Sequence, residues 1–155
     1  MLLSIMGFMN ICSATESGRT RVIDKIVYRF TDASVPPQYH RSYTVTATSN
    51  DVRVVVDSYG DIVADRTFGM SERKMQVLVQ SLDDCGIEST KAGNAQDECT
   101  GGTSRSIRIF SEGTLLMEGT VHNCGGRFFG NLSGDLECFE RSIQGIIPDF
   151  SRLLE

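Results

Sequence analysis

The sequence predicts an α+β domain with an antiparallel sheet of about six strands, arranged as a four-stranded meander, a helix, a β-hairpin and a C-terminal helix. Short stretches of alternating apolar and polar residues, separated by turn residues, indicate antiparallel strands. Two other stretches place apolar residues three and four apart, which is typical of amphipathic helices. At 155 residues the chain has the length of one domain, which we expect to span residues 22–155.

The meander is the first predicted unit of this domain. Its four expected strands are 22–30, 40–48, 52–57 and 61–68. In the first strand Tyr28 and Phe30 share one face, as the two-residue period of a strand requires. We interpret Ser58-Tyr59-Gly60 as a three-residue hairpin loop that ends in glycine. This register places Arg53 opposite Asp65, a complementary pair on one face of the sheet.

Two helices follow from apolar spacing and from capping residues. The first is expected to begin at the N-cap Ser71 and to end at Gly86, because glycine readily takes the left-handed conformation that follows a helix. The second is expected to begin near Ser133 to Asp135, where serine and aspartate both suit an N-cap. Pro148 then breaks it, since proline lacks the backbone N–H that a helix interior needs.

The predicted second hairpin lies between these helices. We interpret Ser111-Glu112-Gly113 as another three-residue loop, which pairs Ile107 with Met117 and gives the hairpin one apolar face. Carried outward, this register brings Cys99 and Cys124 together at the open end of the hairpin. His122 points to the same side as Cys124, because the two residues are two apart on one strand.

This cysteine- and glycine-rich corner is the predicted location of a functional site. Four interpretations of its chemistry are compatible with the sequence. Cys99 and Cys124 are candidates for a disulfide. Together with His122 they are candidates for a zinc site, with Cys138 or Asp97 as the fourth ligand. A Cys124 thiolate activated by His122 is a third reading, and inert half-buried thiols are the fourth.

Two glycine doublets frame the same corner. They are Gly101, Gly102, Gly125 and Gly126. Glycine marks unusual backbone angles or the close approach of a ligand. Turn geometry is the favoured explanation over an anion site at the start of the last helix, because no phosphate-loop spacing and no suitably placed lysine accompany these residues.

A second candidate region follows two successive prolines. Tyr39, His40 and Arg41 place an aromatic ring, an imidazole and a guanidinium after a stiff loop, which indicates an edge for binding a partner. A plain connecting loop is the alternative.

Composition limits the partners. The net charge is −5 and the fifteen basic residues are scattered, so nucleic acid is not expected as a partner. The apolar run at residues 1–11 is too short to cross a bilayer, so no transmembrane segment is expected.

The first 21 residues are expected to be an N-terminal extension or an atypical signal segment, since no basic residue precedes the apolar run. A cytoplasmic location is slightly favoured on that ground. Export is the alternative, because loss of Cys12 with a leader would leave an even set of four cysteines.

Several motifs after Lys25 resemble those of a small family of uncharacterised prokaryotic proteins with no assigned activity. They occupy residues 28–32, 35–37, 39–43, 56–61, 99–103 and 124–126. The resemblance implies a shared fold and no activity. The order sheet, helix, hairpin, helix is also similar to that of small bacterial protease inhibitors of the emfourin type.

The leading functional hypothesis is a non-enzymatic domain that binds a protein or a small ligand. The sequence contains no catalytic triad, no acid and base at a recognisable spacing and no cofactor loop, so no cofactor is expected. One alternative is a thiol- or zinc-dependent site at Cys99, His122 and Cys124. The other alternative is a protease-inhibitor-like protein.

Overall fold

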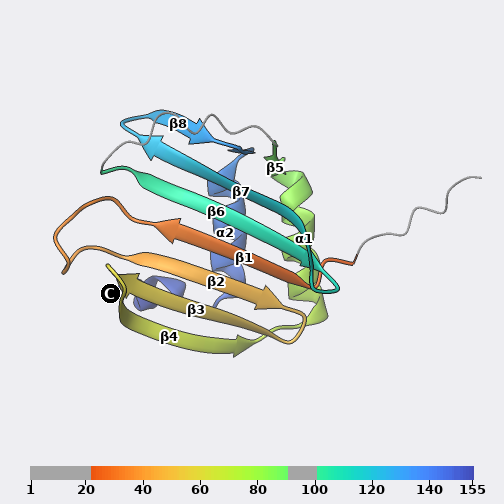
Figure 1. Ribbon diagram of the computed structural model, residues 1–155. Helices are drawn as coiled ribbons and strands as arrows, with labels where there is room; N and C mark the ends of the chain where they lie inside the picture. The colour runs from red at the N-terminus through yellow and green to blue at the C-terminus, as the bar shows by residue number, and fades with distance from the viewer. Residues whose placement is uncertain (1–21, 91–100) are drawn as a thin grey trace, which may run out of the picture.

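Seven antiparallel strands form one continuous sheet in the computed structural model, and both α-helices of the described residues lie against one face of it (Figure 1). The structure describes residues 22–90 and 101–155. The strands of the sheet, in chain order, are β1 Lys25–Thr31, β2 Ser42–Thr48, β3 Asp51–Ser58, β4 Asp61–Gly69, β6 Thr103–Ser111, β7 Thr114–Cys124 and β8 Arg127–Gly130. The predicted α+β class and antiparallel sheet are confirmed.

The spatial order of the strands is β4-β3-β2-β1-β6-β7-β8, so β1 lies at the centre. The meander β1–β4 forms one half of the sheet, and the hairpin β6–β7 pairs with the other side of β1. The short strand β8 extends this second half beyond the strands that the sequence predicts. Tyr28, on the central strand, is fully buried, as expected for a residue covered on all sides.

The two helices begin and end close to where their capping residues predict. Helix α1 spans Glu72–Asp84, and its N-cap Ser71 accepts a hydrogen bond from the Lys74 backbone N–H at 3.3 Å. Gly86 follows the helix with φ +62°, the left-handed conformation that glycine tolerates. Helix α2 spans Leu136–Ile146 with Asp135 as its N-cap. A short 3₁₀ helix, η1 Phe150–Leu154, follows Pro148.

Both helices cross the strands on the same face and lie side by side (Figure 1). Their apolar stripes pack on the sheet through residues such as Leu78 of α1 and Phe139 of α2, which are almost completely buried. No helix among residues 22–90 and 101–155 is long and apolar enough to cross a membrane.

The prediction of three-residue loops in the two hairpins is wrong. Both turns have two residues, Tyr59-Gly60 and Glu112-Gly113, and all four residues have positive φ values between 49° and 96°. Ser58 pairs with Asp61 and Ser111 pairs with Thr114. Two residues of positive φ define the type I′ turn, whose twist matches that of the flanking strands.

A bulge close to each turn shifts the predicted registers. In the first hairpin Val56 pairs with Ala64, and in the second Ile107 pairs with Gly119. The shorter turn alone would shift the pairing by one residue from the predicted register and would turn the apolar side chains to the opposite face. The bulge adds a second shift of one residue, so the apolar side chains stay on the buried face. Arg53 and Asp65 therefore meet diagonally, with an Nη2–Oδ2 distance of 2.6 Å.

Candidate functional site

A cavity of about 550 Å³ lies between the sheet and the start of α2, on the side of the sheet that the helices cover. Its lining residues are Phe30, Thr103, Arg105, Val121, Asn123, Phe128, Leu132, Ser133, Gly134, Asp135, Leu136 and Glu137. The volume falls in the range of small-molecule sites, and the combination of apolar walls with a few polar groups is typical of them.

Strand register builds the floor of the cavity. Phe30, Arg105 and Val121 form one row across β1, β6 and β7. The next row toward the strand ends consists of Thr103, Asn123 and Phe128. Because residues in register share a face, both rows point toward the helices.

The roof is the segment from Leu132 to Glu137, which enters α2. Two of its residues form the short strand β9 Leu132–Ser133, which pairs with β5 Glu88–Ser89. The Asp135 backbone N–H donates to the Cys85 carbonyl at 2.8 Å. A Cβ on Gly134 would collide with the Gly86 carbonyl oxygen, so the two chain segments touch through their backbones.

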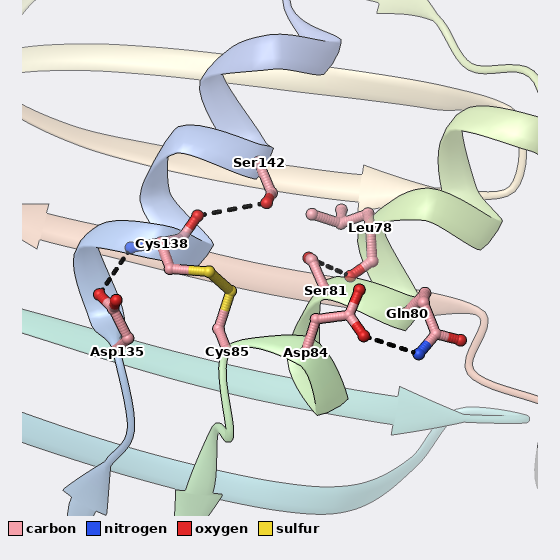
Figure 2. Close-up of a disulfide and its surroundings, with 8 residues drawn as sticks. All are labelled: Leu78, Gln80, Ser81, Asp84, Cys85, Asp135, Cys138 and Ser142. Carbon is pink, nitrogen blue, oxygen red and sulfur yellow. Dashed lines mark hydrogen bonds between the residues drawn. A yellow bond between two sulfur atoms is a disulfide. The ribbon is translucent and has the colours of Figure 1, made fainter.

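A disulfide completes this attachment. Cys85, which caps the end of α1, is bonded to Cys138 in the first turn of α2, with a Cα–Cα distance of 5.8 Å (Figure 2). Asp135 lies beside it and accepts a hydrogen bond from the Cys138 backbone N–H at 2.9 Å. The roof is therefore held to the end of α1 by a covalent bond as well as by backbone hydrogen bonds.

A buried polar cluster adjoins the floor of the cavity. Arg105 donates from Nε to Glu140 Oε2 at 3.1 Å, and its Nη2 lies 3.0 Å from the same oxygen. The Tyr43 hydroxyl donates to the other oxygen, Glu140 Oε1. The side chains of Arg105 and Glu140 are 16% and 12% exposed, so little solvent reaches their charges. Each charge is therefore stabilised mainly by the other.

Burial and neighbouring charges keep Tyr28, Tyr43 and Arg105 protonated near neutral pH. Burial, together with the neighbouring Tyr28 and the hydrogen bond to Glu140, raises the pKa of Tyr43 far above its usual value. Burial and the charge of Glu140 raise the pKa of Tyr28 as well. Burial disfavours the charged form of Arg105, but the charge and hydrogen bond of Glu140 together with those of Tyr28 more than offset this and raise the pKa of the guanidinium. The cluster therefore holds neutral phenols and one ion pair.

Exposed groups form the mouth of the cavity. Phe128 is 65% exposed, which is unusual for a large aromatic side chain. Asp135 and Glu137 are also exposed and contribute two carboxylates. The mouth therefore combines an aromatic ring with negative charge.

The predicted cysteine corner lies at the same end of the sheet, but its disulfides contradict three of the four predicted readings: the zinc site, the activated thiolate and the inert thiols. Cys138 is bonded to Cys85 and cannot be a zinc ligand. Cys124 is also in a disulfide, which removes the thiolate that zinc binding or nucleophilic attack would need. His122 is exposed on the other face of the sheet. Cys99 and Asp97 lie outside the described residues.

No group of three or more His, Cys, Asp or Glu side chains in the described part of the chain is arranged to hold a metal ion. Gly125-Gly126 has positive φ at both residues and forms the tight β7–β8 turn, as the turn interpretation expects. Gly101 also has positive φ, and Gly102 lines a separate hollow beside His40. None of these four glycines lines the cavity.

The three residues of the predicted partner edge lie in different environments. Tyr39 is 70% exposed. Arg41 donates from Nε to the Leu154 carbonyl at 3.0 Å and so holds the C-terminal segment. His40 is buried and stacks on Tyr59, with ring centroids 3.9 Å apart.

His40 also lies 3.4 Å from the Ser42 hydroxyl through Nε2, a pairing of residue types found in serine hydrolases. Its Nδ1 accepts the Tyr59 backbone N–H at 3.3 Å, so neutral His40 carries its proton on Nε2. It cannot take a proton from Ser42 in that tautomer. Both side chains are buried, and the pair is structural.

The sequence did not predict the cavity, although two signals pointed to the polar cluster beside it. Arg105 continues the apolar face of Ile107 and Ile109, and Glu140 interrupts the apolar stripe of α2. A charged residue on a face that must be buried needs a partner. Pairing these two charges would have located the cluster beside the cavity.

No protein-family model, no curated protein and no solved structure matches the chain at a significant level. The resemblance to prokaryotic proteins therefore stays a prediction. The geometry of the cavity is the basis for a functional proposal.

Proposed function

We propose that the protein is a non-enzymatic binding domain whose cavity between β6–β8 and the start of α2 takes a small, largely apolar ligand. The observation that carries this proposal is the cavity itself, with a volume of about 550 Å³ and a rigid, cross-linked roof. Preformed concave sites of this size with mostly apolar walls are the usual form of ligand sites.

The polar groups around the cavity suit binding better than catalysis. Arg105 and Glu140 neutralise each other, and the tyrosines beside them keep their protons well above neutral pH. A general acid or base needs a pKa near the working pH. The cluster therefore supplies rigidity and hydrogen-bonding capacity at the site.

The Cys85–Cys138 disulfide supports the location of this domain in an oxidising compartment. Disulfides persist in secreted and periplasmic proteins and are rare in the reducing cytosol. The proposed ligand is thus one that is met outside the cytosol.

The test uses tryptophol, a neutral indole alcohol, as the probe and NMR chemical shifts as the readout. At roughly −0.3 to −0.5 kcal/mol for each of its heavy atoms, we expect tryptophol to bind with a Kd of roughly 0.05–2 mM. Saturable shifts should concentrate on lining residues such as Val121 and Ser133. If no saturable shifts occur on the cavity lining, the proposal is wrong.

A blocking variant and its matched control locate the binding. Leu136→Trp places a large side chain at the half-buried lining position and should abolish the shifts. Leu115→Trp makes the same change at an exposed position of β7 that does not line the cavity, and it should bind as the wild type does. Equal effects of the two substitutions would contradict the assigned location.

A further inference from the structure

We infer that the cavity selects ligands that carry a positively charged amine on their apolar body. This inference rests on the proposed function and names the ligand class for the same cavity. It follows from the charges at the mouth and from the exposed aromatic ring beside them.

The charge balance of the lining is negative. Arg105 is the only basic residue among the lining side chains of the described chain, and Glu140 already neutralises it at 3.0 Å. Asp135 and Glu137 then remain, both exposed at the mouth. The N-terminus of α2 offsets about half a charge, which leaves the mouth with a net charge of roughly −1.5.

One of these carboxylates has an oxygen to spare. Asp135 uses Oδ1 to accept the Cys138 backbone N–H, and this bond fixes the side chain as the N-cap. Its other oxygen makes no hydrogen bond that involves another described residue. A carboxylate that is held in place by one oxygen and open at the other is a suitable acceptor for an ammonium group.

The aromatic ring at the mouth favours the same ligand. Phe128 is 65% exposed and lines the cavity, so its ring can contact a cation there. The structure already contains such contacts, since the Arg105 guanidinium lies 5.3 Å from the centroid of the Phe30 ring. An amine near Phe128 would gain from the ring and from the two carboxylates together.

An anionic ligand meets the opposite situation. It would have to compete with Glu140 for Arg105, and Glu140 is held from its other side by Tyr43. It would also approach past Asp135 and Glu137. The position at the helix N-terminus where an anion would otherwise bind is occupied by the Asp135 carboxylate.

The experiment compares three probes that share one indole body, with the wild-type protein in its oxidised form. They are tryptamine, which is a cation at pH 7, the neutral tryptophol, and the anion indole-3-acetate. We expect tryptamine to bind about five- to tenfold more tightly than tryptophol, because two exposed carboxylates face the amine and each such pair contributes up to about 1 kcal/mol. Indole-3-acetate should bind more weakly than tryptophol, and 0.5 M salt should reduce the differences.

Variants separate the local charge from the net charge of the protein. Asp135→Asn combined with Glu137→Gln removes both charges and keeps the helix cap, since asparagine caps as well as aspartate. This variant should lose the preference for tryptamine and keep its affinity for tryptophol. The control, Asp61→Asn combined with Glu112→Gln, makes the same change of net charge at exposed positions in or next to the hairpin turns and should keep the preference.

The outcomes distinguish the two proposals. Equal affinities for the three probes, or tightest binding of indole-3-acetate, would overturn the inference and leave the proposed function standing. Loss of the preference in the Asp61/Glu112 control would also overturn it, because the effect would then come from the whole protein's charge. Absence of binding by all three probes would overturn the proposed function itself.

Discussion

Removal of the Cys85–Cys138 disulfide should lower the free energy of unfolding by about 4 kcal/mol. The bond joins residues 53 positions apart in the sequence. In the chain-entropy model, closing a loop of that length removes about 14 cal/mol/K from the unfolded state, which is about 4 kcal/mol at 25 °C. The combined variant Cys85→Ser/Cys138→Ser tests this value.

The measurement is urea unfolding of the wild type and the variant without reductant, so that other cysteines keep their state. With a slope of about 2 kcal/mol/M, the midpoint should fall by about 2 M. The single variant Cys138→Ser is the matched control, because it breaks the same bond and changes one side chain fewer. It should lose nearly as much stability as the double variant.

A loss below about 1 kcal/mol in both variants would refute this reasoning, since the cross-link would then not constrain the unfolded chain. A large loss in the double variant alone would assign the effect to packing around Cys85, which is buried. The same samples can be titrated with tryptophol. We expect weaker binding in the variants, because the cavity roof loses its covalent attachment to the end of α1.

Three further predictions concern the buried cluster and the second disulfide. Glu140→Gln should cost about 3 kcal/mol in urea unfolding, because it leaves Arg105 without its counter-charge, whereas replacing both residues by leucine should cost less. Because the pKa of Tyr43 is higher in the folded than in the unfolded chain, protonated Tyr43 stabilises the fold. This stabilisation is complete below a pH of about 10, which is the pKa of tyrosine in the unfolded chain. Unfolding free energy measured from pH 8 to 11.5 should therefore fall above about pH 10, and Tyr43→Phe should make this fall smaller. Proteolysis without reductant, followed by mass spectrometry, should give a peptide that links Cys99 to Cys124, and a Cys124 linked to any other cysteine would contradict that prediction.

The order of elements could be predicted from the sequence because each one depends on local chemistry. Ser71 and Asp135 cap helices through their own side chains, and Gly86 ends one through its backbone conformation. The hairpin loops were predicted one residue too long because hydrophobic alternation alone cannot reveal a bulge. A two-residue turn with a bulge at Val56 buries the same face as a longer loop does.

The disulfide pairing could not be predicted, because it depends on how the two helices meet. Cys85 ends α1 and Cys138 lies in the first turn of α2, and their distance is set by the packing of both helices on the sheet. The hairpin register alone leaves Cys138 as a spare candidate zinc ligand, because it says nothing of the contact between the helices. That register fixes the position of Cys124 on its strand but does not fix how the two helices lie relative to each other.

The cavity is harder still to predict, because it is the space that packing leaves unfilled. Its floor needs four strands in register, and its roof needs the backbone contact between Gly134 and Gly86. Each requirement depends on side-chain volumes contributed by segments far apart in the chain. The charges are different, because a lone arginine on a buried face predicts a buried partner wherever the chain places it. Arg105 therefore indicates from sequence alone that a polar partner lies against the buried face of its strand, although it indicates neither which element supplies that partner nor that a ligand-sized space lies beside it.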